Sequence, residues 1–305
     1  MTGQEKYNLR MGLLFISPWL CGFILTALYP LVSSLGLSFT DYSVLSKPVF
    51  VGTDNYRDLA TDELFWQSLW NTFYFAAISI PLNLGLALAL AIMLNLNLPG
   101  KKYFRTIYFL PSLVPMVCLA VLWQWMLNGR LGLINAMLRP ITDVLSAVLE
   151  VSISPPNWLV DPAYAKLGLV LAGMWGVGNA VVIFMAGLQD VPRALYDAAD
   201  LDGCNFWQKT RHVTLPIISP VIYFNGIMGL IGSFQVFAVP YVMTDGGEGP
   251  ARSLLFAATY IFNKTFRSLS MGYACAISLI LFLIILALTL VATKLTKRHI
   301  HYEGK

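Results

Sequence analysis

Charged side chains are scarce in this sequence of 305 residues, where Asp, Glu, Lys and Arg together make up 12%. Soluble domains contain about 25% of these four residues. Apolar residues reach 57%, and the mean hydropathy is +0.67. Composition therefore argues against a soluble protein and indicates a chain that crosses a membrane several times.

The sequence also lacks the motifs of several enzyme classes. It has no G-x-x-x-x-G-K-[ST] phosphate loop, because Gly100-Lys101 has neither the upstream glycine nor a following Ser or Thr. The four cysteines lack metal or redox spacing, no H-E-x-x-H occurs, and the His299-x-His301 pair is a weak metal signal. Lys and Arg do not cluster with aromatic residues as in nucleic-acid patches. We expect no catalytic residue, metal, cofactor or nucleic-acid partner for this chain.

Six windows are long and apolar enough to cross the roughly 30 Å of bilayer hydrocarbon. None contains Asp, Glu, Lys, Arg or His, which weakens the case for an ion-driven carrier, since such carriers usually need an ionisable group in the membrane. We predict an all-α membrane protein with six transmembrane helices in a single transmembrane domain. The expected spans are residues 12–39, 69–94, 107–127, 167–188, 217–243 and 271–293.

Basic residues are unevenly distributed over the two sides that six spans create. One side carries twelve Lys and Arg and the other carries eight. The positive-inside rule assigns the richer side to the cytoplasm, so we expect both termini and the loop 190–216 there. The richer side holds Lys6, Arg10, Lys101, Lys102, Arg105, Arg193, Lys209, Arg211, Lys294, Lys297, Arg298 and Lys305.

The loop 190–216 is the one long polar segment wedged between two strongly apolar runs. Pro192 suits the first turn of a helix, and Gly203 allows a backbone turn that a side chain would resist. Asn205 followed by Gln208 resembles a capping box that opens a second helix. We predict two short helices bent at Gly203. By itself, this pattern fits an amphipathic linker on the membrane or a surface that another protein approaches.

The loop contains the residues Leu195-Tyr196-Asp197-Ala198-Ala199, Asp202-Gly203, Trp207-Gln208 and Leu215-Pro216. Their spacing resembles a known motif, the EAA loop of ABC-importer permeases. Asp197, Cys204 and Thr210 stand where Glu, Ala and Phe are usual. Shorter matches elsewhere resemble carbohydrate permeases of the maltose and glycerol-phosphate first-permease type. The shorter matches are Phe50-Val51-Gly52, Asp54-Asn55-Tyr56, Asn71-Thr72, Phe109-Leu110-Pro111, Gly187-Leu188-Gln189 with Pro192, and Thr244-x-Gly246-Gly247.

The resemblance implies a permease subunit with the type I ABC-importer fold, in the cytoplasmic (inner) membrane of a bacterium or archaeon. Its implied partners are a second permease, two ATPase subunits that hold ATP and Mg²⁺, and an extracytoplasmic substrate-binding protein. A sugar or related neutral solute is the implied substrate, and glycerol-3-phosphate or a polyol is the alternative substrate. The six-span topology by itself would also fit a different function, that of an ATP-independent channel or secondary carrier. The residues expected at the ATPase contact are Tyr196, Asp197, Ala198, Ala199, Asp202, Gly203, Leu215 and Pro216.

Polar and aromatic residues inside the fourth and fifth predicted spans are candidates for the substrate pathway. Asn179 and Gln235 need hydrogen-bond partners away from water and could bind sugar hydroxyls. Trp175 or Phe234 could stack on a sugar ring, and Ser233 lies beside them in sequence. The resemblance implies a sugar site on these two spans. The alternative is that these residues only join neighbouring helices, as amides and small residues commonly do in membranes.

Overall fold

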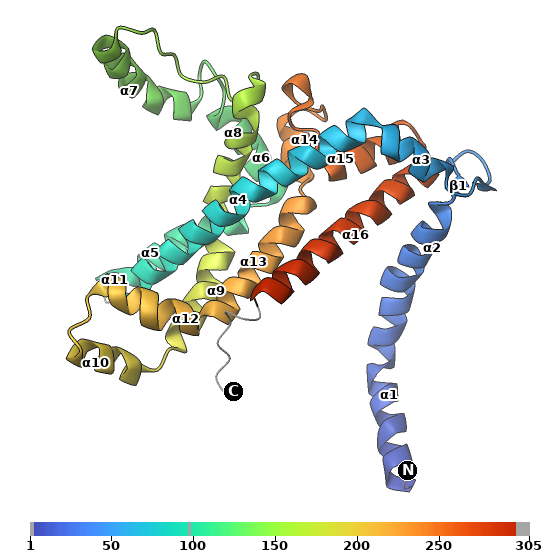
Figure 1. Cartoon of the computed structure of the whole chain (residues 1–305), viewed down its shortest axis with the longest axis horizontal. Helices are drawn as coiled ribbons and strands as arrows, with labels where there is room; N and C mark the ends of the chain where they lie inside the picture. Colours follow the sequence, from blue (N-terminus) through green and yellow to red (C-terminus); the bar gives the residue numbers. More distant parts are fainter. Residues whose placement is uncertain (1–2, 97–98, 297–305) are drawn as a thin grey trace. The chain divides into compact units, whose positions relative to one another are not determined.

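The computed structural model describes residues 3–96 and 99–296, and most of them are helical (Figure 1). Lys297, Arg298 and Lys305, which contribute to the predicted charge bias, lie outside the described residues, as do His299 and His301. The chain forms two compact units. The first comprises Met1–Phe65 and Ile261–Leu283, and the second comprises Trp66–Tyr260 and Ile284–Lys305.

The first unit joins the N-terminal helices to the beginning of the last long helix. Hydrogen bonds to backbone carbonyls hold it together, because Gly272 N donates to Tyr42 O at 3.1 Å and the side-chain amide of Asn55 donates to Ser38 O and Thr40 O. The two strands pair antiparallel. Its elements are α1 (Gly3–Phe23), η1 (Ile24–Leu28), α2 (Tyr29–Leu37), β1 (Thr40–Asp41), β2 (Val49–Phe50), α3 (Asp54–Thr61), η5 (Asn263–Arg267) and the first part of α16 (Met271–Thr296).

The second unit contains most of the remaining helices and both large apolar clusters. Its elements are α4 (Glu63–Asn95), α5 (Lys101–Phe109), η2 (Leu110–Leu113), α6 (Met116–Met126), α7 (Leu133–Leu149), α8 (Pro162–Trp175), α9 (Gly178–Gln189), α10 (Arg193–Leu201), α11 (Phe206–Lys209), η3 (Thr210–Thr214), α12 (Leu215–Ile217), α13 (Ser219–Phe234), α14 (Ala238–Met243), η4 (Pro250–Arg252) and α15 (Ala257–Phe262). The first residues of α4 and the last of α15 belong to the first unit.

Three helices are long and apolar enough to cross a membrane unbroken, namely Tyr7–Leu37, Glu63–Asn95 and Met271–Thr296. The described residues give up to six spans if each of three bent helix pairs counts as one. The pairs bend by 99° between η2 and α6, by 49° between α8 and α9, and by 70° between α12 and α13.

The first two bends interrupt the windows 107–127 and 167–188 in their interior, and the third interrupts the window 217–243 at its first residues. Pro111 and Pro115 flank the first bend, a Gly176-Val177-Gly178 sequence forms the second, and Pro216 and Pro220 flank the third. Proline removes a backbone donor and glycine lowers helix stability, which explains why the helices break there. The window 217–243 is interrupted again, because α13 ends at Phe234 and α14 begins at Ala238.

Two buried apolar clusters hold the second unit together. One cluster surrounds Trp123 of α6 and Trp158, which lies just before α8. The other surrounds Phe184 and Leu188 of α9 and includes residues of α4. Helix α9 lies very close to α13, because a Cβ on Gly187 would come within 2.7 Å of a Val221 methyl carbon. The second cluster lies directly next to the polar loop that follows α9.

Candidate coupling surface and pathway cavity

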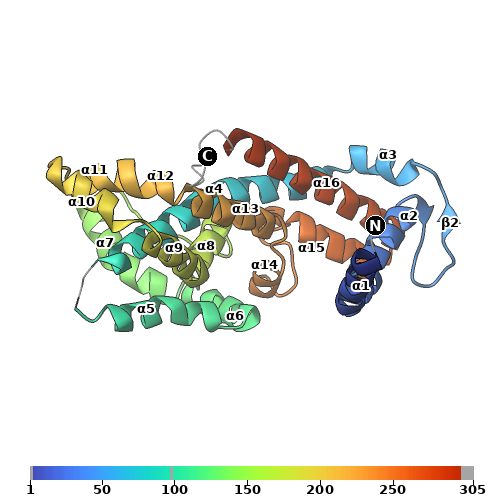
Figure 2. The same cartoon turned by 90° about the horizontal axis from the view of Figure 1, so that it is seen from below.

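The polar loop between α9 and α13 forms the two short helices that the sequence predicts, α10 and α11 (Figures 1 and 2). Gly203 between them has φ +72°, a conformation that glycine adopts without steric cost. The turn closes through backbone bonds from Gly203 N to Asp200 O at 3.0 Å and from Cys204 N to Ala199 O at 2.9 Å. The predicted bend at Gly203 is therefore confirmed.

The predicted capping box at the start of α11 is also present. Asn205 Oδ1 accepts from Gln208 N at 2.9 Å, and Gln208 Oε1 accepts from Asn205 N at 2.7 Å. Lys209 forms an ion pair with Asp200, which joins α11 to α10. Thr210, which replaces the usual aromatic, donates its hydroxyl to Phe206 O at 2.9 Å at the point where α11 passes into the π-helix η3. Local polar contacts therefore fix the shape of the loop.

Tyr196 anchors the loop to the body of the second unit. Its hydroxyl lies 2.9 Å from Thr214 Oγ1, and its ring packs on the apolar cluster around Phe184 and Leu188. Leu215 packs on the same cluster, and Ala199 is buried on the inner face of α10. Packed side chains and one hydrogen bond thus connect α10 to α9 and η3.

The opposite face of the loop is exposed and carries a prominent apolar tip. Leu201 is 91% exposed and Trp207 is 76% exposed, while Phe206 beside it is 47% exposed. Of the eight residues predicted at the contact, Tyr196, Ala199 and Leu215 face inward and Pro216 is half-buried. The exposed members are Asp197, Ala198, Asp202 and Gly203.

Leu201, Phe206 and Thr214 were not among the predicted site residues. Thr214 gives no sequence signal, because its role depends on a contact with Tyr196 eighteen positions away. Leu201 could have been found, since it is an isolated apolar residue between Asp200 and Asp202. Trp207 belongs to the motif but was not assigned to the contact.

A cavity of about 400 Å³ lies between α4, α8, α9 and α13, and all of its polar lining residues are neutral. Asn83 Oδ1 is buried there without a hydrogen-bond partner among the residues that the structure describes. Asn225 donates to Val221 O at 3.0 Å, and Ser233 Oγ lies 3.4 Å from Ser79 Oγ. Asn179 completes the polar lining, so the cavity offers several uncharged hydrogen-bonding groups in an otherwise apolar wall.

The structure brings two of the five predicted pathway residues, Asn179 and Ser233, to this cavity. Trp175 is half-exposed and packs edge-to-face on Trp123 with ring centres 6.2 Å apart. Phe234 is 1% exposed and lies against Phe73, so in this conformation its ring is covered. Gln235 is exposed in the break after α13 and does not line the cavity.

Asn83, which was not assigned to the predicted pathway, also lines the cavity, together with Asn225 of the fifth predicted span. Both lie inside predicted spans, so their sequence signal was a neutral amide in an apolar window. Asn179 also lines a neighbouring cavity of about 260 Å³ with Phe75, and therefore separates two hollow regions of the second unit.

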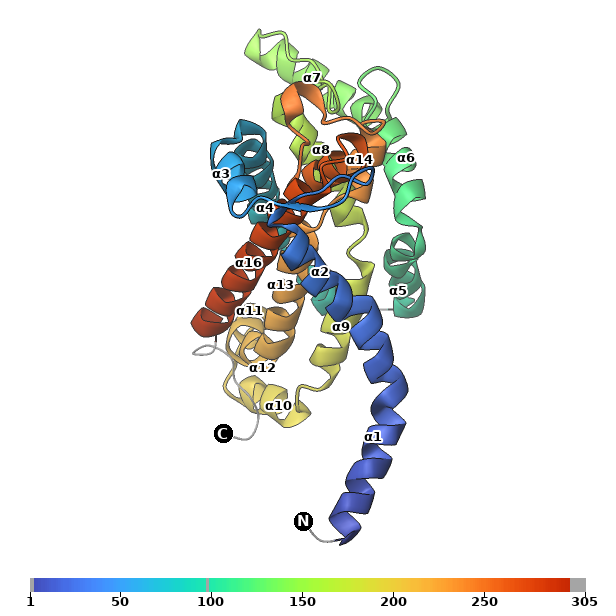
Figure 3. The same cartoon turned by 90° about the vertical axis from the view of Figure 1, so that its right-hand side faces the viewer.

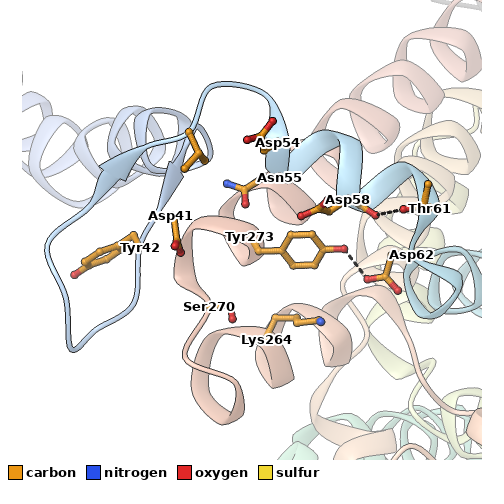
Figure 4. A pocket seen from close by; sticks show the side chains of 11 residues that line it. Asp41, Tyr42, Asp54, Asn55, Asp58, Thr61, Asp62, Lys264, Ser270 and Tyr273 are labelled. Carbon is orange, nitrogen blue, oxygen red and sulfur yellow. Dashed lines mark hydrogen bonds between the residues drawn. The ribbon is translucent and has the colours of Figure 1, made fainter.

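In the first unit, a polar pocket of about 630 Å³ lies among β1, α3, η5 and the start of α16 (Figure 4). Tyr273 donates its hydroxyl to Asp62 Oδ2 at 2.6 Å, while Asp62 Oδ1 accepts from Leu64 N and Phe65 N at the start of α4. Lys264 Nζ lies 5.0 Å from the centre of the Tyr273 ring. Within residues 3–96 and 99–296, no three acidic, His or Cys side chains are placed to hold a metal ion. The polar groups of the pocket thus join α3, α4 and α16.

These features define a helical membrane subunit with a cavity of neutral lining and a separate polar loop anchored to the helices around that cavity. Residues 83–300 match the family described as binding-protein-dependent transport system inner membrane component. The chain belongs to this family. It is a multi-pass permease component.

Similar proteins support the same assignment. The probable ABC transporter permease protein YesP of Bacillus subtilis is 36% identical over 99% of this chain and 94% of its own length. The lactose transport system permease protein LacF of Rhizobium radiobacter is 35% identical over 94% of each chain. These relatives are transporter permeases by name, and none is described as an enzyme.

A solved structure with the same fold is a bacterial alginate ABC transporter in complex with an alginate pentasaccharide-bound periplasmic protein. The matched chain has a TM-score of 0.78, with 22% identity over 97% of this chain and 96% of that one. At this identity the likeness establishes the fold.

Proposed function

We propose that this chain forms half of the translocation pathway of an ATP-driven importer for a sugar or a related neutral solute. The lactose permease relative supports the substrate class. The cavity supports it independently, since Asn83, Asn179 and Asn225 present neutral amides of the kind that pair with hydroxyl groups. A phosphorylated or strongly anionic solute would favour a cationic lining, so this cavity favours a neutral one.

The polar loop is proposed to couple this pathway to separate ATPase subunits. The observation that carries the proposal is the division of α10 into two faces, with Tyr196 and Ala199 packed inward and Leu201 exposed at the tip together with Trp207. Exposed apolar side chains on a polar loop mark a protein contact. Since the sequence has no phosphate loop, ATP and Mg²⁺ would be held by the partner.

The proposed coupling role of the loop also implies an orientation of the chain in the membrane. We infer that each bent helix pair crosses the membrane once, giving six spans with both termini and the coupling loop on the cytoplasmic side of a bacterial or archaeal inner membrane. The excess of Lys and Arg on that side supports this orientation. The remaining proposed partners are a second permease of the same family and an extracytoplasmic substrate-binding protein, as the complex of the alginate transporter with its periplasmic protein suggests.

A substitution at the loop tip tests the coupling role. Leu201→Asp places a charge where an apolar contact with the ATPase is expected. We expect at least about a tenfold loss of apparent affinity for the ATPase subunit, the effect of removing one anchor residue from an interface. The measurement is co-purification of the ATPase with the tagged permease at graded ATPase expression.

Leu131→Asp is the matched control, because Leu131 is 92% exposed against 91% for Leu201 and lies outside the coupling loop. The control should bind the ATPase like the wild type, and both variants should insert into the membrane in normal amounts. Normal ATPase recovery with Leu201→Asp would contradict the proposal.

A further inference from the structure

Another cavity, of about 300 Å³, lies where α5 packs against α9 and is also lined by Leu94 near the end of α4. Figure 3 shows α5 beside α9. Helix α9 approaches very closely, since a Cβ on Gly178 would lie 2.7 Å from Tyr108 O. Most of the wall is apolar and comes from Leu94, Phe109, Val181, Val182, Met185 and Ala186. The cavity reaches Gln189, the last residue of α9 and therefore the start of the coupling loop.

One cation, Arg105 of α5, faces this apolar wall. Its Nε is buried and has no hydrogen-bond partner among the described residues. Burying such a donor without an acceptor is unfavourable, and it is more unfavourable when the group is charged. The site is therefore incomplete, and an anionic oxygen is the group that would complete it.

Two further cations stand beside Arg105 on the same helix. Lys101 and Lys102 precede it by four and three positions, which places them one turn away on neighbouring parts of the helix surface. Basic pockets between membrane helices attract anionic lipid headgroups, and nearby lysines add long-range attraction to an anionic leaflet. Charge and apolar surface thus occur together at the end of α9 that leads into the coupling loop.

We infer that this cavity binds an anionic phospholipid, with a phosphate oxygen accepting from Arg105 and an acyl chain lying against Val182, Met185 and Ala186. A free anion would make no use of the apolar wall. A carboxylate from a partner subunit would satisfy Arg105 but would leave the wall uncovered. The lipid is the one ligand that matches both parts of the site, and this inference does not depend on which solute is transported.

The test is native mass spectrometry of the purified transporter complex titrated with phosphatidylglycerol. Arg105→Gln removes the charge, and Ala186→Phe fills the groove while leaving Arg105 in place. Ala186 is exposed to the cavity, so the larger ring does not displace the core. Each variant should weaken lipid binding by about tenfold, the size expected for one charge-assisted hydrogen bond or a blocked chain site.

Arg10→Gln is the matched control, because it removes the same charge from an exposed position of α1. It should bind phosphatidylglycerol like the wild type, whereas phosphatidylcholine and glycerol phosphate should bind the wild type far more weakly than phosphatidylglycerol does. Three results would overturn the inference: unchanged binding by Arg105→Gln, equal competition by glycerol phosphate without acyl chains, or loss of complex assembly in Arg105→Gln, which would assign Arg105 to a protein partner.

Discussion

At the scale of single residues, Gly203 sets the geometry of the coupling loop. Its φ of +72° is a conformation in which a Cβ is strained by roughly 1–2 kcal/mol, although no neighbouring atom would meet that Cβ within 4 Å. The requirement is thus one of backbone conformation and not of space. Any residue other than glycine would favour a different angle between α10 and α11.

Gly203→Ala should therefore reduce ATP-driven solute uptake. The variant should still insert into the membrane and should still bind the ATPase subunits, although more weakly than the wild type. We expect ATP hydrolysis per solute transported to rise, because the loop would move without carrying α9 and η3 with it. Gly36→Ala is the control, since Gly36 is helical, has open space around it and has no positive φ. Equal uptake by the two variants would contradict this role of Gly203.

The hydrogen bond between Tyr196 and Thr214 gives a second prediction at this scale. Tyr196→Phe keeps the ring on the apolar cluster and removes only the hydroxyl, so we expect the loop to lose about 1 kcal/mol of local stability. Thr214→Val should cause a similar loss, and the double variant should cost little more than either alone. Hydrogen exchange of the α10 amides measures this, and additive losses would show that the two hydroxyls do not act together.

At the scale of helices, α4, α8, α9 and α13 create the neutral cavity that we assign to the solute pathway. Asn179→Leu and Asn225→Leu should each lower uptake by about fivefold to tenfold through loss of hydrogen bonds to solute hydroxyls, with ATPase binding unchanged. Uptake at graded solute concentrations in cells checks this. Normal uptake by both variants would assign the amides to helix packing instead.

Sequence predicted the local features of the loop well because their causes are local. The capping box of Asn205 and Gln208 and the turn at Gly203 depend on residues within a few positions of each other. Which of the predicted pathway residues line the cavity could not be read from the sequence, because their positions depend on packing between distant helices. Asn83 reaches the same cavity as Ser233, and Phe234 is covered by Phe73, through contacts that no short-range pattern encodes.

The same difference between local and long-range causes explains how far the membrane spans could be predicted. Hydropathy identified six apolar windows, but two of them are broken in their interior by bends of 99° and 49°, and a third is bent by 70° at its first residues. Apolar composition is unchanged by a bend, so a hydropathy window cannot detect one. Proline and glycine at Pro111, Gly178 and Pro216 gave the available signal, and the angles themselves depend on the helices packed on each side.

At the scale of the whole molecule, the protein is one component of a transport system with several subunits. It belongs to a family of binding-protein-dependent transport components, and the loop is the part through which we propose that ATP-driven motion enters. Rigid packing from Tyr196 to Phe184 gives that motion a physical route toward the helices around the cavity.

The most direct test of the coupling claim is a contact measurement in the assembled transporter. A photo-reactive amino acid in place of Leu201 should crosslink to the ATPase subunit, giving a product whose mass is the sum of the two chains. The same group in place of Leu131, which is equally exposed, should give no such product. Absence of the ATPase crosslink from position 201, or an equal yield from position 131, would contradict the account.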